Sequence, residues 1–280
     1  MSIDAITTIR EEAERLISAL TLADPGQKVP TCPAWTADDL LWHLTEVHEF
    51  WAEILATGAL TDDEVTAIEA AKAPRPEKRE ALLERRAAAT AALLAQLEAR
   101  ADEEPAWFWF SEQQSVGTTR RMQTHEVAIH RVDAELTAGH PVSASDPRLA
   151  AAGLDHVLEV MWPAAYEWIP DWATTTPVAA VEIRPQGGAP RWLGISRWKG
   201  TRPRDGQEFD VPVGRLLGGP PASGELPRAG ARGSAAALNL WAWGREQALD
   251  HLADGAQTVR IQGDPEAIAA LEALIAEGHD

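Results

Sequence analysis

A carboxylate and an imidazole stand four residues apart in the stretch Met122–Leu136, which reads MQTHEVAIHRVDAEL. Its apolar residues recur with the period of an amphipathic helix, which places Glu126 and His130 on one helical face. Such a pair can bind one divalent metal ion if a third ligand comes from elsewhere in the fold. The alternative is a solvated ion pair, the commoner role of Glu and His at this spacing. The spacing alone leaves both interpretations open.

His125 directly precedes Glu126 and suggests a zincin helix, but the spacing does not fit. A zincin helix needs two histidines at positions i and i+4, whereas His125 and His130 are five residues apart. We therefore expect any metal on this helix to be bound by Glu126 and His130, with His125 turned away from that face.

Composition limits the class of protein. The 280 residues are enough for two modest domains with buried cores. The formal net charge of −18 argues against a nucleic-acid partner, because such a surface repels a phosphate backbone. Neither a membrane span nor a secretory signal is recognisable, and the single cysteine, Cys32, excludes a disulfide framework or a cysteine-based zinc ribbon. We expect a soluble, cytoplasmic protein.

Four segments of helical periodicity precede residue 140, and helices of their length predict an antiparallel bundle whose core can hold a metal. In the second of them, Thr36 is the expected N-cap, and His43 lies within the apolar stripe. His48 falls about 140° further round the helix, which predicts a surface position. The segment 62–76 is polar and is expected to be a loop with a short helix at most. The first helix is expected from a cap at Ser2 or Asp4 to near Asp24, and the second from Thr36 to near Gly58. The other two are expected at about 77–101 and 118–138.

The second half of the chain has a different pattern. Asp146-Pro147 opens a helix, since Asp is a good cap and Pro suits the first turn. We predict a two-domain α+β protein, with a four-helix bundle over residues 1–145 and a mixed α+β domain over 146–280. In the second domain, strands are expected at 177–185, 191–200 and 258–263, and further helices at 234–252 and after Asp264-Pro265.

Two motifs of the first half, VPTCPAWTADDLLWHL (29–44) and HEVAIHRVDAE (125–135), resemble the mycothiol-dependent maleylpyruvate isomerase family, which belongs to the DinB-like metal-binding bundles. The segments GSAAALNLWAWGR (233–245) and RIQGDPEAI (260–268) resemble the C-terminal domain of this family, which has a sterol-carrier-like α+β fold. The chain departs from the family at Ala34, where glycine is usual, and in the segment 58–78.

This resemblance implies a third ligand for the metal. It assigns His43, Glu126 and His130 to a divalent ion, expected to be zinc, with mycothiol as the cosubstrate that takes the open position. It also implies that an arginine of the second domain meets an anionic group of the substrate across a cleft between the domains. Arg245 is the candidate for this role, and the alternative is that Arg245 complements the dipole of a helix end.

The expected function is that of a zinc-dependent, mycothiol-using enzyme acting on a small electrophile. It would be either a cis-trans isomerase or an S-transferase, since both reactions need the same metal and thiol. The rival interpretation is a non-catalytic metal- or ligand-binding regulatory protein on the same fold.

Three further features carry weaker predictions. Cys32 is expected to be packed rather than nucleophilic. Arg131 and Asp133 are expected to form an ion pair that holds the fold, unless Asp133 supports His130. The aromatic run from Trp107 to Phe110 is expected to plug the core or to form a pocket wall.

Overall fold

The computed structural model describes residues 3–222, 224 and 226–277, and the chain divides into two compact units, Met1–Ala144 and Ser145–Asp280. In the described part of the chain, no helix is long and apolar enough to cross a membrane.

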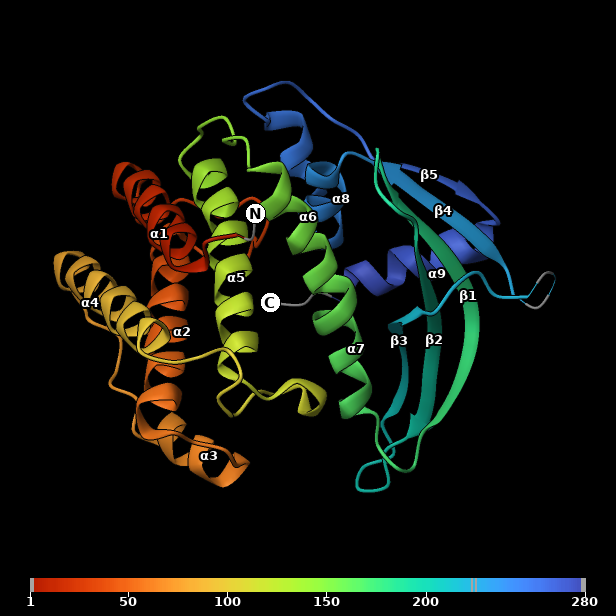
Figure 1. Cartoon of the computed structure of the whole chain (residues 1–280), viewed down its shortest axis with the longest axis horizontal. Coiled ribbons are helices and arrows are strands. Elements are labelled where there is room, and N and C mark those ends of the chain that lie inside the picture. The colour runs from red at the N-terminus through yellow and green to blue at the C-terminus, as the bar shows by residue number, and fades with distance from the viewer. Residues whose placement is uncertain (1–2, 223, 225, 278–280) are drawn as a thin grey trace. The chain divides into compact units, whose positions relative to one another are not determined.

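The first unit is built from four long helices, as the sequence predicts. α1 packs against α5, and α2 packs against both α4 and α5 (Figure 1). A short helix, α3, lies in the segment for which a short helix at most was expected. The bounds are α1 Ala5–Leu22, α2 Ala37–Thr57, α3 Asp62–Ala70, α4 Arg79–Glu98 and α5 Val116–Thr137, with a 3-10 turn, η1, at Ser111–Gln113.

Both ends of α2 are fixed by local sequence. The Thr36 side chain accepts from the backbone N–H of Asp39, and the Asp39 side chain accepts from the backbone N–H of Thr36, which is a complete capping box. Gly58 ends the helix at φ 68°, a left-handed conformation that glycine adopts without steric cost. These signals hold α2, and therefore His43, in register with the bundle.

The apolar core of the first unit lies between α1, α2, α4 and α5. Its members include Leu16, Leu40 and Leu44, and Cys32 packs against it partly buried, as expected for a packed cysteine. Burial of such side chains supplies most of the stability of the bundle.

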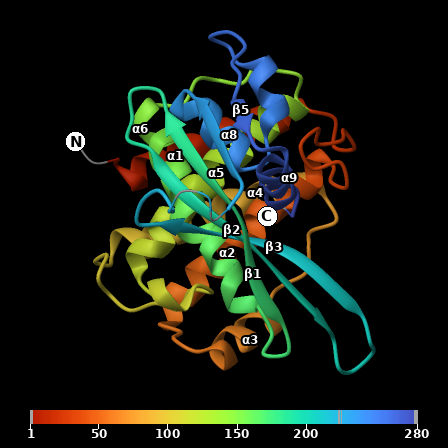
Figure 2. The same cartoon turned by 90° about the vertical axis from the view of Figure 1, so that its right-hand side faces the viewer.

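The second unit contains a five-stranded sheet in the order β3-β2-β1-β4-β5. β1 pairs antiparallel with β2 and parallel with β4, while β2–β3 and β4–β5 are antiparallel pairs. Figure 1 shows the curved sheet with the helices of this unit gathered on its concave side, and Figure 2 faces the strands. The strands are β1 Thr174–Pro185, β2 Arg191–Thr201, β3 Glu208–Leu217, β4 Arg228–Gly233 and β5 Arg260–Gly263.

The helices of this unit confirm one prediction and correct another. The helix that opens at Asp146-Pro147 extends through α6, a π-helical turn and α7. The helix expected over 234–252 is interrupted, because Gly244 at φ 73° ends α8 before the 3-10 segment η4 begins. The bounds are α6 Pro147–His156, η2 Val157–Met161, α7 Trp162–Ala164, η3 Ala165–Trp168, α8 Ala235–Ala242, η4 Glu246–His251 and α9 Pro265–Ala276.

Two strands were not predicted from the sequence. β3 carries a proline, Pro212, in its interior, and β4 is only six residues long with two glycines. Both features weaken the strand pattern, since proline cannot donate to a ladder and glycine has no side chain to pack. Pairing with β2 and β1 overrides these local preferences.

Candidate metal centre

Three side chains from two helices of the first unit converge on one point. α2 contributes His43, and α5 contributes Glu126 and His130. Glu126 Oε1 lies 3.2 Å from His43 Nε2 and 3.3 Å from His130 Nε2. Within the described residues these three form a potential metal-binding group, with all ligand atoms within 4.8 Å of one another. The helical spacing of Glu126 and His130 therefore gives a shared face, as predicted.

The group is buried on one side and accessible on the other. The side chain of His130 is fully buried and that of Glu126 is 7% exposed, whereas 24% of the His43 side chain is exposed. The ring of Trp35 lies over that of His43, with 4.7 Å between the ring centroids. A small molecule would reach the centre from the His43 side.

Asp133 holds His130 from behind. His130 Nδ1 lies 2.8 Å from a carboxylate oxygen of Asp133, and the other oxygen accepts from the Thr31 hydroxyl at 2.5 Å. A hydrogen bond from Nδ1–H to a carboxylate fixes the ring tautomer and leaves the Nε2 lone pair free for a metal. This contact corresponds to the sequence-based alternative in which Asp133 supports His130.

The donor set fits a divalent metal ion. His130 Nε2 is buried and faces the other two candidate ligands; its contact with Glu126 Oε1, at 3.3 Å, is an ion pair without the geometry of a good hydrogen bond. Two imidazoles and a carboxylate are the ligands of many catalytic zinc sites. The spacing of the residues left both a metal site and a solvated ion pair open. The burial of His130 Nε2 beside the other two candidate ligands favours the metal site.

The electrostatics of the centre also favour a cation. Burial alone would lower the pKa of His130, but the adjacent carboxylates of Glu126 and Asp133 outweigh it and raise the pKa to about 10. Burial likewise acts to raise the pKa of Glu126, and the neighbouring His130 and His43 outweigh it and lower that pKa. Without metal, His130 is therefore protonated, and its positive charge lies between the carboxylates of Glu126 and Asp133. A bound metal ion would replace this proton and supply the positive charge.

His125 and Arg131, which neighbour the candidate ligands on α5, differ in role. His125 is almost completely buried, and burial together with Arg121 lowers its pKa to about 3. It is outside the group of potential ligands, in agreement with the spacing argument. Arg131 is fully buried and donates to Glu12 and to Glu135 at 2.7 Å each, so this arginine ties α5 to α1.

The prediction that His48 lies on the surface is wrong. His48 is fully buried, and its Nδ1 lies 2.8 Å from Arg86 Nη1 on α4. The physical reason is that α2 is covered on two sides, by α5 and by α4, so it has a wider buried face than one apolar stripe indicates.

The aromatic run after α4 supports the fold. Phe108 and Phe110 are buried, and Trp107 stacks on Trp51 at 5.9 Å between centroids. Trp107 Nε1 also donates to Asp62 at the start of α3, at 2.7 Å. These contacts match the core-plug interpretation.

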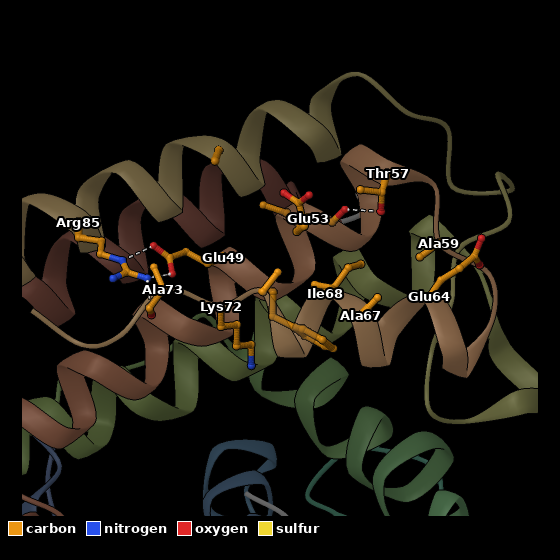
Figure 3. Close-up of a pocket in the computed structure, with 14 residues that line it drawn as sticks. Glu49, Glu53, Thr57, Ala59, Glu64, Ala67, Ile68, Lys72, Ala73 and Arg85 are labelled. Carbon is orange, nitrogen blue, oxygen red and sulfur yellow. Dashed lines mark hydrogen bonds and ion pairs between the residues drawn. The ribbon is translucent and has the colours of Figure 1, made fainter.

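The helical unit has a groove between α2, α3 and α4 with a volume of about 830 Å³ (Figure 3). Ala67 and Ile68 of α3 line one side of it, and the paired Glu49 and Arg85 lie at one end. None of the three candidate metal ligands lines this groove, so it is separate from the metal centre.

Arg245 lies in the second unit, just beyond the end of α8. Its side chain is buried, and Nη1 donates to the carbonyl oxygen of Trp243, the C-cap residue of α8, at 2.7 Å. This contact is the one expected of a cation that complements a helix end. Its predicted role towards a substrate stays a prediction.

Fold and site together define an α+β protein whose helical unit carries a three-residue candidate metal centre. Residues 6–135 match the family model described as the mycothiol maleylpyruvate isomerase N-terminal domain. Two crystal structures of the mycothiol-dependent maleylpyruvate isomerase, one of a histidine-to-alanine mutant, each match with a TM-score of 0.50 and 14% sequence identity. Each match covers 94% of this chain and 95% of the other, which shows a shared fold. A search of curated protein sequences found no match.

Proposed function

We propose that this protein is a metal-dependent enzyme that activates mycothiol for reaction with a small electrophile. The observation that carries the proposal is the convergence of His43, Glu126 and His130, with the buried Nε2 of His130 facing the other two. Three protein ligands leave an open coordination position, which is typical of catalytic rather than structural zinc. Zinc is the proposed metal, and the family match supports mycothiol as the thiol.

The residues around the centre have separate tasks in this proposal. A metal bound here would lower the pKa of a coordinated thiol, so that the reactive thiolate forms at neutral pH. Asp133 orients His130 and keeps its Nε2 available, while Glu126 supplies the negative charge that holds the ion. Trp35 packs beside the rings of His43 and His130, with 4.7 and 6.1 Å between the ring centroids, and helps to hold them in place.

Isomerisation and S-transfer share this site and differ in one later step. In both, the thiol sulfur forms a bond to an electrophilic carbon of the substrate. In isomerisation that bond breaks again after rotation about the former double bond, and the thiol is returned. In S-transfer the carbon–sulfur bond remains, and the substrate either takes up a proton, when the thiol has added to a double bond, or releases a leaving group, when it has displaced one. We propose isomerisation of a maleylpyruvate-type substrate first, because the family match is to an isomerase domain.

The ligand set is tested by elemental analysis of the purified chain. We expect about one zinc per chain in the wild type and a large loss in His130→Ala. His125→Ala is the matched control, because it removes a buried histidine from the same helix that lies outside the ligand group. Equal zinc content in wild type and His130→Ala would overturn the assignment.

The reaction is tested by following maleylpyruvate with mycothiol and the zinc-loaded protein. We expect thiol-dependent isomerisation that disappears after chelation and returns with zinc. Arg245→Lys keeps the charge but loses the planar fork, so turnover should fall while zinc content stays unchanged. If the zinc-loaded protein leaves mycothiol, maleylpyruvate and other electrophiles unchanged, the non-catalytic binding function takes the place of this proposal.

A further inference from the structure

The interior of the helical unit contains a positive charge that the proposed function does not use. Arg86, on α4, is fully buried, although arginine is rarely buried completely unless it is paired. Its Nη1 donates to the Thr90 hydroxyl at 2.7 Å and contacts His48 Nδ1 at 2.8 Å. Its Nε and Nη2 are buried without a hydrogen-bond partner. No ion pair between described residues includes Arg86.

His48 connects this arginine to the metal centre. It follows His43 by five residues on α2, which is a rise of roughly 7.5 Å along the helix. Burial and Arg86 lower the pKa of His48 well below its usual range, and Glu126 and His43 also act on it. His48 is therefore neutral, and it lies within electrostatic range of both Arg86 and Glu126.

The charge of Arg86 remains at neutral pH, since burial lowers its pKa only to about 9. The other buried arginine near the centre, Arg131, is already matched by Glu12 and Glu135. A divalent ion on His43, Glu126 and His130 would be matched by the carboxylates of Glu126 and Asp133. Arg86, by contrast, is a buried positive charge with no carboxylate partner among the residues that the structure describes, and it is joined to the metal centre through His48.

We propose that Arg86 is a positioning residue of the metal centre, whose buried charge favours an anionic fourth ligand over a neutral one. This inference rests on the proposed function, in which the fourth ligand is a thiolate. A buried charge acts through protein rather than water and is little screened by salt. The rise of roughly 7.5 Å between His43 and His48 and the 2.8 Å contact of His48 with Arg86 set a separation on the order of 10 Å. At that separation, with an effective dielectric constant of about 20, the charge should strengthen the binding of a monovalent anion by about tenfold.

The test uses the full chain loaded with cobalt(II), whose visible absorption reports the fourth ligand. Thiocyanate is the anionic probe and imidazole the neutral one, both titrated at one fixed pH. Arg86→Met removes the charge at similar length, and it leaves no carboxylate unpaired because Arg86 has no ion-pair partner. Arg86→Lys keeps the charge, and Thr90→Val disturbs the same buried layer without changing its charge.

We expect thiocyanate affinity to fall about tenfold in Arg86→Met, with imidazole affinity unchanged. Both affinities should stay near those of the wild type in Arg86→Lys and Thr90→Val. Equal thiocyanate affinity in wild type and Arg86→Met, or a parallel loss for both probes, would overturn the inference. If Arg86→Met does not fold, Arg86→Gln carries the same expectation. Absence of a cobalt spectrum in the wild type would instead overturn the metal centre itself, which is a different and recognisable failure.

Discussion

The carboxylate of Asp133 provides a sharp test of the metal centre, because it touches a candidate ligand without being one. It is fully buried, with His130 Nδ1 at 2.8 Å on one oxygen and the Thr31 hydroxyl at 2.5 Å on the other. In Asp133→Asn, the amide oxygen can still accept from His130, and the amide N–H can donate to the Thr31 oxygen. Both hydrogen bonds can therefore survive, and the main loss is the negative charge behind His130.

The expected magnitude follows from this geometry. Loss of the partner behind a metal-bound histidine weakens metal binding by about 10- to 100-fold. Because Asp133→Asn keeps the shape and the hydrogen bonds, it should fall at the lower end, about tenfold, or about 1.4 kcal/mol. Asp133→Ala loses the bond to His130 as well, so its effect should approach about 100-fold.

The assay is competition for zinc against a chromophoric chelator, with Thr31→Val as the matched control. That control removes only the hydroxyl on the far side of Asp133 and keeps the charge, so its zinc affinity should change by less than about threefold. Wild-type affinity in Asp133→Asn would refute the reasoning. An equal loss in Thr31→Val would do so too, because it would mark a general structural effect.

Three further outcomes follow from the same structure. Arg131→Met should lower the free energy of unfolding in urea by about 3–5 kcal/mol, since Glu12 and Glu135 lose their buried partner; unchanged unfolding would contradict this. Thr36→Ala should cost about 1 kcal/mol in the same assay by removing the cap of α2. The pKa of His130 in the metal-free fold is about 10, against the ordinary 6.5. The stability that comes from its protonation is therefore complete below about pH 6.5 and is lost as pH rises through 10, measurable by urea unfolding of chelated protein.

The sequence predicts those parts of the site that lie on a single helix. Glu126 and His130 share a face because of the 3.6-residue period, and that pairing needs no knowledge of other helices. The third member, His43, required the resemblance to a known family, since periodicity cannot say which helices meet. The burial of His48 was missed for the same reason, because α4 covers a part of α2 that the apolar stripe does not mark.

The limits in the second unit are of another kind. The strands β1, β2 and β5 overlap the predicted segments, whereas β3 and β4 were missed. The interior Pro212 of β3 and the glycines of β4 contradict local strand preference, and only pairing with neighbouring strands stabilises them. The end of α8 at Gly244 depends on a left-handed backbone that the sequence WAWGR permits but does not require.

The most direct test of the central proposal is X-ray absorption spectroscopy of the zinc-loaded chain with and without mycothiol. Without thiol, we expect only nitrogen and oxygen ligands at about 2.0–2.2 Å, from His43, Glu126, His130 and water. With mycothiol, a zinc–sulfur distance of about 2.3 Å should appear, and it should persist in Cys32→Ser, which removes the single cysteine of the chain. A sulfur ligand in the absence of mycothiol, or none after its addition, would contradict the proposal that this centre binds and activates a thiol.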